Sequence, residues 1–372
     1  MNKIKVLFVV TRCMKSGPIQ VINNIANYID DSKFEIYLVT INQEDENRSL
    51  LSEMKNKYIL TQFSISKIQA ITGQYKEFLE YVECLAPDVI HSTGLIPDYI
   101  IGREFPEKQL IISHANDVAD YEMQFGKIVG RFFSNWHINI MKNAKKVIAC
   151  SKSLSEFYNR EFSLPMEFIR NGIVVSESKT SSTAISRKKI GIKENSFLFI
   201  YTASFNNRKN HVFILKMFEK YKDEFKNCDL LLLGDGKNYK KLYNEFSGYT
   251  NIHFIGRVKN VEDYLNISDG FISPSKQEGM PMAVLEAMNC GLPYILSDIP
   301  QHREIYELNR NIGKLYKLDD EKDFVNKMKV IVNYKKAKLK EEIEKVVFDN
   351  FNAEKMSQNY QNVYERISNN VI

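Results

Sequence analysis

The chain of 372 residues is poor in cysteine and has a single tryptophan. Its five cysteines form no Cys-x-x-Cys pair, which argues against a disulfide framework and against a structural zinc site, and fits a reducing compartment. No apolar run approaches the roughly 20 residues that a membrane-spanning helix needs. The run Val6–Val10 is too short for the core of a signal peptide, and Arg12 follows it closely. These absences predict a cytoplasmic protein.

The charge balance does not indicate a nucleic-acid partner. The net charge is only +5, with 26% charged residues and 44% hydrophobic residues, so nothing indicates a nucleic-acid partner. The length exceeds the roughly 250–300 residues at which a single core stops growing, which predicts two domains.

Strand-like and helix-like segments alternate along the chain, as in doubly wound α/β domains. Ile4–Val10 is predicted as a strand, a loop with Gly17 follows, and a helix and a second strand are expected at 21–29 and 36–41. Residues 67–85 are predicted as one helical segment. We expect an N-terminal domain at 1–175, a linker at 176–189 that is rich in Ser, Thr and Lys, a second domain at 190–350, and a C-terminal helix at 351–372 that packs on the N-terminal domain.

The stretch from Ser273 to Pro293 carries the strongest signal of a binding site. An apolar strand precedes it, a loop carries Glu278 and Gly279, Met280-Pro281 opens a helix, and Gly291 ends that helix. Backbone N–H groups over 279–282 at a helix N-terminus form an anion site. Carboxylates on either side of such a site would accept hydrogen bonds from hydroxyls. This combination predicts a nucleotide-sugar ligand.

This stretch resembles the E-x7-E motif of retaining glycosyltransferases of the GT-B fold, most closely family 4, through Glu278, Glu286 and the surrounding P-S-x-x-E-G-x-P and C-G-x-P patterns. The resemblance implies two Rossmann-like doubly wound domains with the donor in the cleft between them. It also implies that Glu278 positions the donor sugar and that Glu286 binds the ribose. His114, in Ser-His-Ala-Asn at a strand end, is similar to the family histidine that contacts the donor sugar. His91, at another strand end, is a weaker candidate.

The basic run after the strand at 197–202 resembles the family's diphosphate site. The family has an Arg and a Lys five apart; Lys209 matches the Lys, Ser204 stands at the Arg position, and the neighbouring Arg208 is a candidate substitute. Gly17 matches one glycine of a family Gly-Gly pair, with a tight turn as its ordinary role. The resemblance therefore implies the catalytic residues Glu278, His114 and Lys209. The implied substrate-binding residues are Gly17, Ser204, Arg208, Gly234, Arg257, Val258, Gly279, Met280, Pro281, Met282 and Glu286.

The reaction implied by the resemblance is sugar transfer from a nucleotide sugar, with a UDP-sugar expected, to a hydroxyl of a glycan or lipid-linked acceptor in bacterial surface-polysaccharide synthesis. No further cofactor is expected. No metal is expected either, because the chain has no Asp-x-Asp sequence. Two alternatives remain open. A nucleotide-sugar epimerase of the same fold would release another nucleotide sugar or a free sugar, and a non-catalytic partner subunit would be expected to lose Glu278, Lys209 or His114.

One segment has no acidic residue, from 123 to 155. Large apolar residues, including Phe133 and Trp136, alternate there with the six cations Lys127, Arg131, Lys142, Lys145, Lys146 and Lys152. This composition predicts contact with an anionic membrane, at the inner face of the cell membrane. Each outward cation would add about 1 kcal/mol, so three or four would add about 3–4 kcal/mol. The alternative is a packed helix with a solvated basic face.

Overall fold

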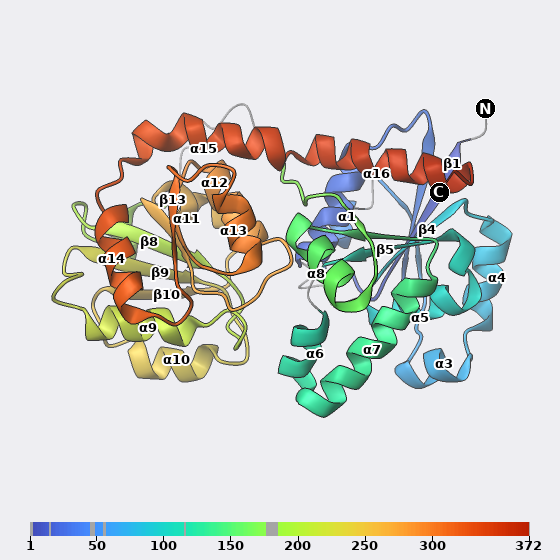
Figure 1. The fold of residues 1–372 in the computed structure, drawn as a ribbon, viewed down its shortest axis with the longest axis horizontal. Helices are drawn as coiled ribbons and strands as arrows, with labels where there is room; N and C mark the ends of the chain where they lie inside the picture. The colour runs from blue at the N-terminus through green and yellow to red at the C-terminus, as the bar shows by residue number, and fades with distance from the viewer. Residues whose placement is uncertain are drawn as a thin grey trace. The chain divides into compact units, whose positions relative to one another are not determined.

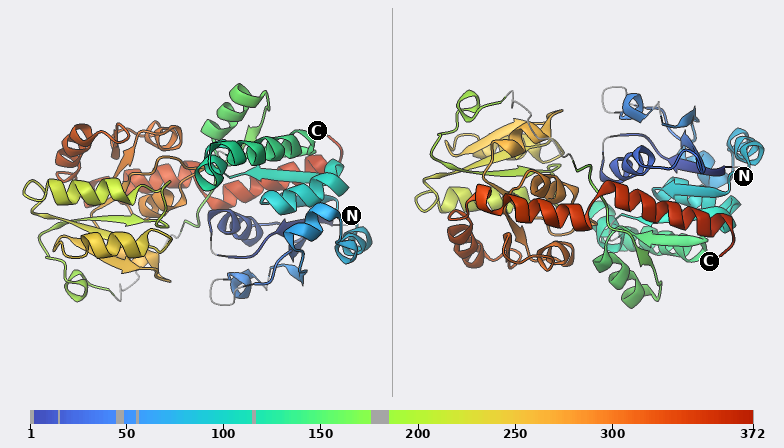
Figure 2. Two further views of the ribbon diagram at one scale, coloured as in Figure 1. Left: turned by 90° about the horizontal axis from the view of Figure 1, so that it is seen from below. Right: turned by 90° about the horizontal axis from the view of Figure 1, so that it is seen from above.

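The computed structural model describes residues 3–14, 16–44, 49–54, 57–114, 117–175 and 185–371, which form two compact units (Figure 1). Unit 1 comprises Met1–Val174 and Asn352–Ile372, and unit 2 comprises Val175–Phe351. Each unit contains a parallel sheet with helices on both of its faces (Figure 2). The linker predicted at 176–189 falls largely on 176–184, which lie outside the described residues.

Within the described residues, unit 1 contains a seven-stranded sheet with the order β3-β2-β1-β4-β5-β6-β7. Its strands are β1 (Ile4–Val10), β2 (Phe34–Thr40), β3 (Ile59–Gln62), β4 (Val89–Thr93), β5 (Gln109–Ser113), β6 (Lys146–Ala149) and β7 (Glu167–Phe168). Every neighbouring pair is parallel. The order reverses between β1 and β4, as in doubly wound folds. The first strand has the predicted bounds.

The helices of unit 1 differ from the prediction in two places. They are α1 (Gly17–Asn27), α2 (Leu51–Met54), α3 (Lys67–Thr72), α4 (Lys76–Leu85), α5 (Leu95–Glu104), the 3₁₀ helix η1 (Pro106–Lys108), α6 (Asp117–Phe125), α7 (Lys127–Asn143), α8 (Lys152–Phe162) and α16 (Ala353–Ser368). The single helix predicted over 67–85 is wrong: Gly73, at φ +78°, ends α3 with a left-handed cap before α4 begins. The first helix begins at Gly17, before the predicted Val21.

Both faces of the unit 1 sheet are covered, which explains the continuous apolar run of its first strand. Leu7 and Val9 face one core with residues of α4 and α5. Phe8 faces the other side, where its ring packs edge-on against Tyr364 of α16 at 6.3 Å. The hydroxyl of Ser357, also on α16, donates to the carbonyl of Ile25 at 2.7 Å. The C-terminal helix is therefore part of the unit 1 core.

Within the described residues, unit 2 has a six-stranded sheet with the order β10-β9-β8-β11-β12-β13. Its strands are β8 (Phe197–Thr202), β9 (Cys228–Leu233), β10 (Ile252–Gly256), β11 (Gly270–Ser273), β12 (Tyr294–Ser297) and β13 (Gly313–Tyr316). Its helices are η2 (Arg187–Ile190), α9 (His211–Lys220), α10 (Tyr239–Phe246), α11 (Val261–Asn266), α12 (Met282–Asn289), α13 (Pro300–Tyr306), α14 (Glu321–Ile331) and α15 (Lys336–Asn350). All pairs are parallel, and the order reverses between β8 and β11.

The structure thus shows two Rossmann-like parallel-sheet units, as predicted. Among the described residues, no helix combines the length and apolarity needed to cross a bilayer.

Candidate functional site

The candidate site of unit 2 lies where the strand order reverses. Ligands of open α/β sheets bind outside the carboxyl ends of the strands at this point, because the loops of the two central strands leave in opposite directions. The loop after β8 carries Arg208 and Lys209, and the loop after β11 carries Glu278. A backbone hydrogen bond from the Lys276 N–H to the Arg208 carbonyl, at 2.8 Å, joins the two loops.

Glu278 is held by two cations at the meeting of these loops. Its side chain is only 5% exposed. The ammonium of Lys209 donates to Oε1 of Glu278 at 2.5 Å, and Nη1 of Arg208 lies 3.7 Å from Oε2. The sequence could not establish that adjacent residues point the same way, and here both approach one carboxylate. Arg208 and Lys209 therefore form one cationic pair around Glu278.

The charge state of Glu278 follows from these contacts. Burial alone would raise the pKa of the carboxyl. The charges of Lys209 and Arg208 and the Lys209 hydrogen bond outweigh burial and lower the pKa from 4.5 to about 2. Glu278 is therefore an anion at neutral pH, with two cations beside it.

A buried hydrogen-bond network links the two loops to the ends of the strands. The hydroxyl of Tyr201, at the end of β8, contacts the carbonyl of Lys209 at 2.9 Å and the hydroxyl of Ser275 at 3.1 Å. The hydroxyl of Ser297, at the end of β12, donates to the Ser275 carbonyl. Three strands thus hold the cation-bearing loop against the Glu278 loop. Sequence reasoning missed this network, whose only signal is the hydroxyl residues at the strand ends.

His302 on α13 completes the network as a neutral side chain. Its Nδ1 lies 2.8 Å from the Ser297 carbonyl; since a carbonyl only accepts, this nitrogen carries the proton. Burial lowers the pKa of His302 from 6.5 to about 4, although the charge of Glu278 acts in the opposite direction. The imidazole therefore adds no charge near Glu278 at neutral pH.

The predicted anion site lies at the start of α12. The helix begins at Met282, and Pro281 is its N-cap. The predicted start at Met280-Pro281 is therefore slightly too early. Gly279, Met280 and Pro281 are buried, while Met282 and Glu286 are half-buried. The first N–H groups of a helix have no acceptor within the helix, which suits them to an anion. Glu286 lies on the second turn of α12, beyond Glu278.

The remaining predicted positions of unit 2 lie along the same sheet edge. Ser204 is exposed on the loop after β8. Arg257, after β10, is exposed, with Nη1 3.7 Å from the Asp235 carboxylate, and Val258 is half-buried beside it. Gly234 follows β9, where its φ of +130° favours glycine and a Cβ would lie 2.1 Å from the Ala203 carbonyl oxygen. Gly234 therefore allows the loops after β8 and β9 to touch.

Replacing Gly234 with Ala should lower the free energy of unfolding by about 2 kcal/mol or more, since the strained φ alone costs roughly 1–3 kcal/mol and the backbone oxygen must also move. Gly248→Ala is the matched control, because no atom lies within 4 Å of its Cβ position; it should change stability by less than about 0.5 kcal/mol. Urea unfolding of both variants checks this. Equal stabilities of the two variants would show that the contact between the loops after β8 and β9 does not require glycine at 234.

The other candidates belong to unit 1. His114 follows β5 and is half-buried, and Gly17 is the first residue of α1 rather than a turn residue. His91 on β4 is fully buried, with Nδ1 2.9 Å from the Tyr364 hydroxyl. Burial lowers the pKa of His91 from 6.5 to about 3. His91 is thus a neutral core residue that joins β4 to α16.

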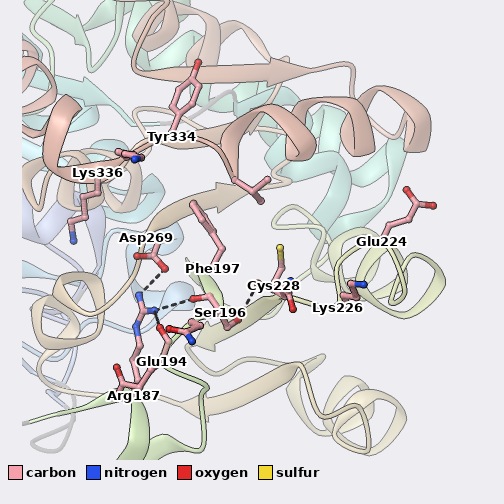
Figure 3. Close-up of a pocket in the computed structure, with 14 residues that line it drawn as sticks. Arg187, Glu194, Ser196, Phe197, Glu224, Lys226, Cys228, Asp269, Tyr334 and Lys336 are labelled. Atoms are coloured by element: carbon pink, nitrogen blue, oxygen red, sulfur yellow. Dashed lines mark hydrogen bonds and ion pairs between the residues drawn. The ribbon is translucent and has the colours of Figure 1, made fainter.

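Unit 2 also has a pocket of about 570 Å³ at the opposite edge of its sheet (Figure 3). It lies at the amino ends of β8, β9 and β11, beside Phe197, Cys228 and Asp269. The guanidinium of Arg187 is bound there to Asp269 at 2.7 Å and to the Ser196 carbonyl at 2.9 Å. The positive charge of Arg187 is paired with Asp269. This pocket is separate from the Glu278 site.

Comparisons with known proteins show what the chain is similar to. Residues 182–362 match the family described as "Glycosyl transferases group 1". The O-antigen biosynthesis glycosyltransferase WclY of Escherichia coli is 24% identical over 99% of this chain and 100% of its own length. UDP-Gal:alpha-D-GlcNAc-diphosphoundecaprenol alpha-1,3-galactosyltransferase of E. coli is 24% identical over 84% of this chain and 77% of its own.

Solved structures show the same fold. The structure of Anabaena Alr3699/HepE in complex with UDP-glucose has a TM-score of 0.78 and 16% identity, covering 97% of this chain and 99% of that one. WaaG, a glycosyltransferase involved in lipopolysaccharide biosynthesis, has a TM-score of 0.75 and 15% identity, covering 96% and 99%. The two parallel-sheet units therefore have the fold of the GT-B glycosyltransferases, and residues 182–362 match the family of group 1 glycosyl transferases.

Proposed function

We propose that this protein transfers a sugar from a nucleotide sugar, with UDP as the nucleotide, to a hydroxyl of a glycan or lipid-linked acceptor in the synthesis of a bacterial surface polysaccharide, with retention at the anomeric carbon. The observation that carries the proposal is the buried Glu278 between Lys209 and Arg208 at the switch point of unit 2. The names of similar proteins support the context: one acts in O-antigen biosynthesis, and another uses UDP-Gal.

The chemistry proposed for these residues is electrostatic. Breaking the bond between sugar and diphosphate places negative charge on the leaving diphosphate. Lys209, Arg208 and the first amides of α12 would stabilise this charge, and preorganised groups of this kind usually make the largest contribution to catalysis. Glu278 would hold the donor sugar, Glu286 the ribose, and His114 of unit 1 a donor-sugar hydroxyl. No side-chain base is assigned for the acceptor; the leaving phosphate is proposed to take its proton.

A donor panel tests the proposal. UDP-, GDP- and CMP-sugars are each added to the protein, and the thermal unfolding midpoint and the slow release of free nucleotide are measured. We expect a UDP-sugar to raise the midpoint and to be hydrolysed slowly. Conversion of the donor into an isomeric nucleotide sugar would instead show an epimerase. Absence of any shift or turnover with all donors would contradict the proposal.

The same assay with EDTA tests metal independence. Among the described residues, no group of three or more His, Cys, Asp or Glu side chains is placed to hold a metal ion, and the Arg208–Lys209 pair offers two positive charges in its place. We therefore propose that turnover survives EDTA largely intact. Complete loss that manganese or magnesium restores would mean that a metal neutralises the diphosphate.

We also propose that the transfer takes place on the cytoplasmic side of a membrane that carries the acceptor, with contact through the segment 123–155. Support comes from its basic and apolar composition. The name of one similar protein includes a diphosphoundecaprenol acceptor, and an enzyme that uses a lipid-linked acceptor must reach it at a surface.

A further inference from the structure

The segment 123–155 does not present one uniform surface. Lys146 is bound to Glu167, and Lys152 lies 3.6 Å from Glu156. Lys142 is exposed on the last turn of α7, about 22 Å along the helix from Lys127 at 1.5 Å per residue. The six cations predicted as one patch are therefore divided, and only Lys127 and Arg131 lie near the start of α7.

Two large aromatics of the segment, Trp136 and Phe133, are packing residues. The ring of Trp136 lies 4.9 Å from Tyr99 of α5, and the ring of Phe133 lies 5.1 Å from Phe125. Both Trp136 and Phe133 are half-buried. They hold α7 to its neighbours, as in the alternative of a packed helix.

A different set of apolar residues is exposed where α6 turns into α7. Ile128 is 88% exposed and Phe132 is 68% exposed. Met123, Phe125 and Val129 are also exposed. Together with Lys127 and Arg131, these residues form what we call the hairpin tip, residues 123–132. Neither cation makes an ion pair with a described residue, and both are exposed. The tip thus combines unpaired positive charge with side chains that water solvates poorly.

Close contacts hold α6 and α7 together behind the hairpin tip. A Cβ on Gly130 would lie 2.4 Å from the Tyr121 carbonyl oxygen, so the two helices cross in backbone contact. The Tyr121 hydroxyl lies 3.2 Å from Nδ1 of His137, and Nε2 of His137 lies 3.0 Å from the Asp98 carboxylate on α5. Figure 1 shows α6 and α7 side by side, with their shared turn at the lower edge of unit 1. These contacts join α6, α7 and α5 at the base of the tip.

From this geometry we infer that the hairpin tip docks unit 1 on an anionic lipid bilayer, with Ile128 and Phe132 in the interface and Lys127 and Arg131 on the headgroups. Apolar side chains interspersed with Lys and Arg are typical of interfacial membrane contacts. A protein partner with an acidic apolar surface fits the charge but is not required by any other observation. The inference rests on the proposed membrane location and names the residues that provide it.

Vesicle co-sedimentation of the full chain tests the inference, using vesicles with an anionic lipid and vesicles of phosphatidylcholine alone. Wild type should bind the anionic vesicles and be released by high salt. The double variant Lys127→Glu, Arg131→Glu should bind at least about tenfold more weakly, because each cation contributes about fivefold. The double variant Ile128→Ser, Phe132→Ser should also lose at least about tenfold.

Matched controls separate the tip from general surface effects. Ile68→Ser with Ile71→Ser removes two equally apolar, exposed side chains from α3. Lys57→Glu with Lys67→Glu makes the same charge change at exposed positions outside the segment 123–155. Both controls should bind like wild type. Equal binding by tip variants and wild type, no binding by wild type, or equal losses in the controls would each overturn the inference.

Two further measurements keep the outcome distinct from that of the proposed function. Slow hydrolysis of a soluble nucleotide sugar without vesicles should be unchanged in the tip variants, so a failed membrane test leaves the transfer reaction intact. Light scattering without vesicles should show the same oligomeric state for wild type and the Ile128→Ser, Phe132→Ser variant. A wild-type dimer that this variant dissociates would assign the tip to self-association and overturn the membrane inference.

Discussion

Replacing Glu278 with Ala should lower turnover of the nucleotide sugar by at least about two orders of magnitude, comparable with the loss of one preorganised transition-state contact. The carboxylate is anionic at neutral pH, because the cations around it hold its pKa at about 2. Its removal would delete the proposed contact to the donor sugar and would free Lys209 and Arg208 from the position in which they meet the diphosphate. Steady-state nucleotide release measures the effect.

Two controls accompany this variant. Glu262→Ala removes an exposed carboxylate from α11 and should leave turnover within about twofold of wild type, because nothing in the site depends on it. Glu278→Gln keeps the side-chain volume, so it separates loss of charge from loss of packing; thermal unfolding shows whether each variant is folded. Near-normal turnover of folded Glu278→Ala would remove Glu278 from the active site.

The second large effect is expected at Lys209. Lys209→Met removes from the buried Glu278 carboxylate the nearer of its two partners, since Arg208 lies 3.7 Å away. Breaking a buried pair by removing one partner costs about 3–5 kcal/mol. The exposed pair Lys220–Glu321 provides the control. Lys220→Met should cost much less, because solvent screens an exposed pair. Urea unfolding at neutral pH compares the two variants.

The pH dependence of stability gives Lys209→Met a second measurement. Glu278 has a lower pKa in the folded protein than its usual 4.5, so its contribution is fully present above about pH 4.5 and is lost as the pH falls toward 2. Without Lys209, the pKa of Glu278 in the folded protein rises, and this contribution shrinks. The variant should therefore be destabilised mainly above pH 4.5, and its deficit should decrease toward pH 2. A deficit that is constant with pH, or equal to that of Lys220→Met, would contradict the pairing.

Much of the fold was predictable because local patterns determine it. β1 and β8 have the predicted bounds, since each is a short apolar run between polar segments. The break at Gly73 was missed because a glycine inside a helical pattern also occurs in continuous helices, and only its φ of +78° identifies the cap. The observed starts of α1 and α12 differ from the predicted ones by a few residues. Helix ends depend on cap geometry, which periodicity does not reveal.

The site was predictable only in part. Glu278 and Lys209 were predicted through the family resemblance, and the structure brings them into contact. The direction of Arg208 was not, because it depends on contact with a residue 70 positions away. The Tyr201–Ser275 contact likewise joins residues 74 apart in the sequence. At the hairpin tip, composition revealed the basic and apolar character, but periodicity alone could not tell which aromatics pack inward; the packing of Trp136 on Tyr99 decided that.

The place of α16 in unit 1 has a consequence for biosynthesis. Unit 2 is one continuous stretch of chain, whereas unit 1 is interrupted by the whole of unit 2. Until Tyr360 and Tyr364 leave the ribosome, the side of β1 that carries Phe8 and the buried His91 on β4 lack their covering helix. Domains generally fold as units during synthesis. During synthesis, unit 2 can therefore complete its fold before unit 1 does. Until then the N-terminal part of unit 1 has an uncovered apolar face.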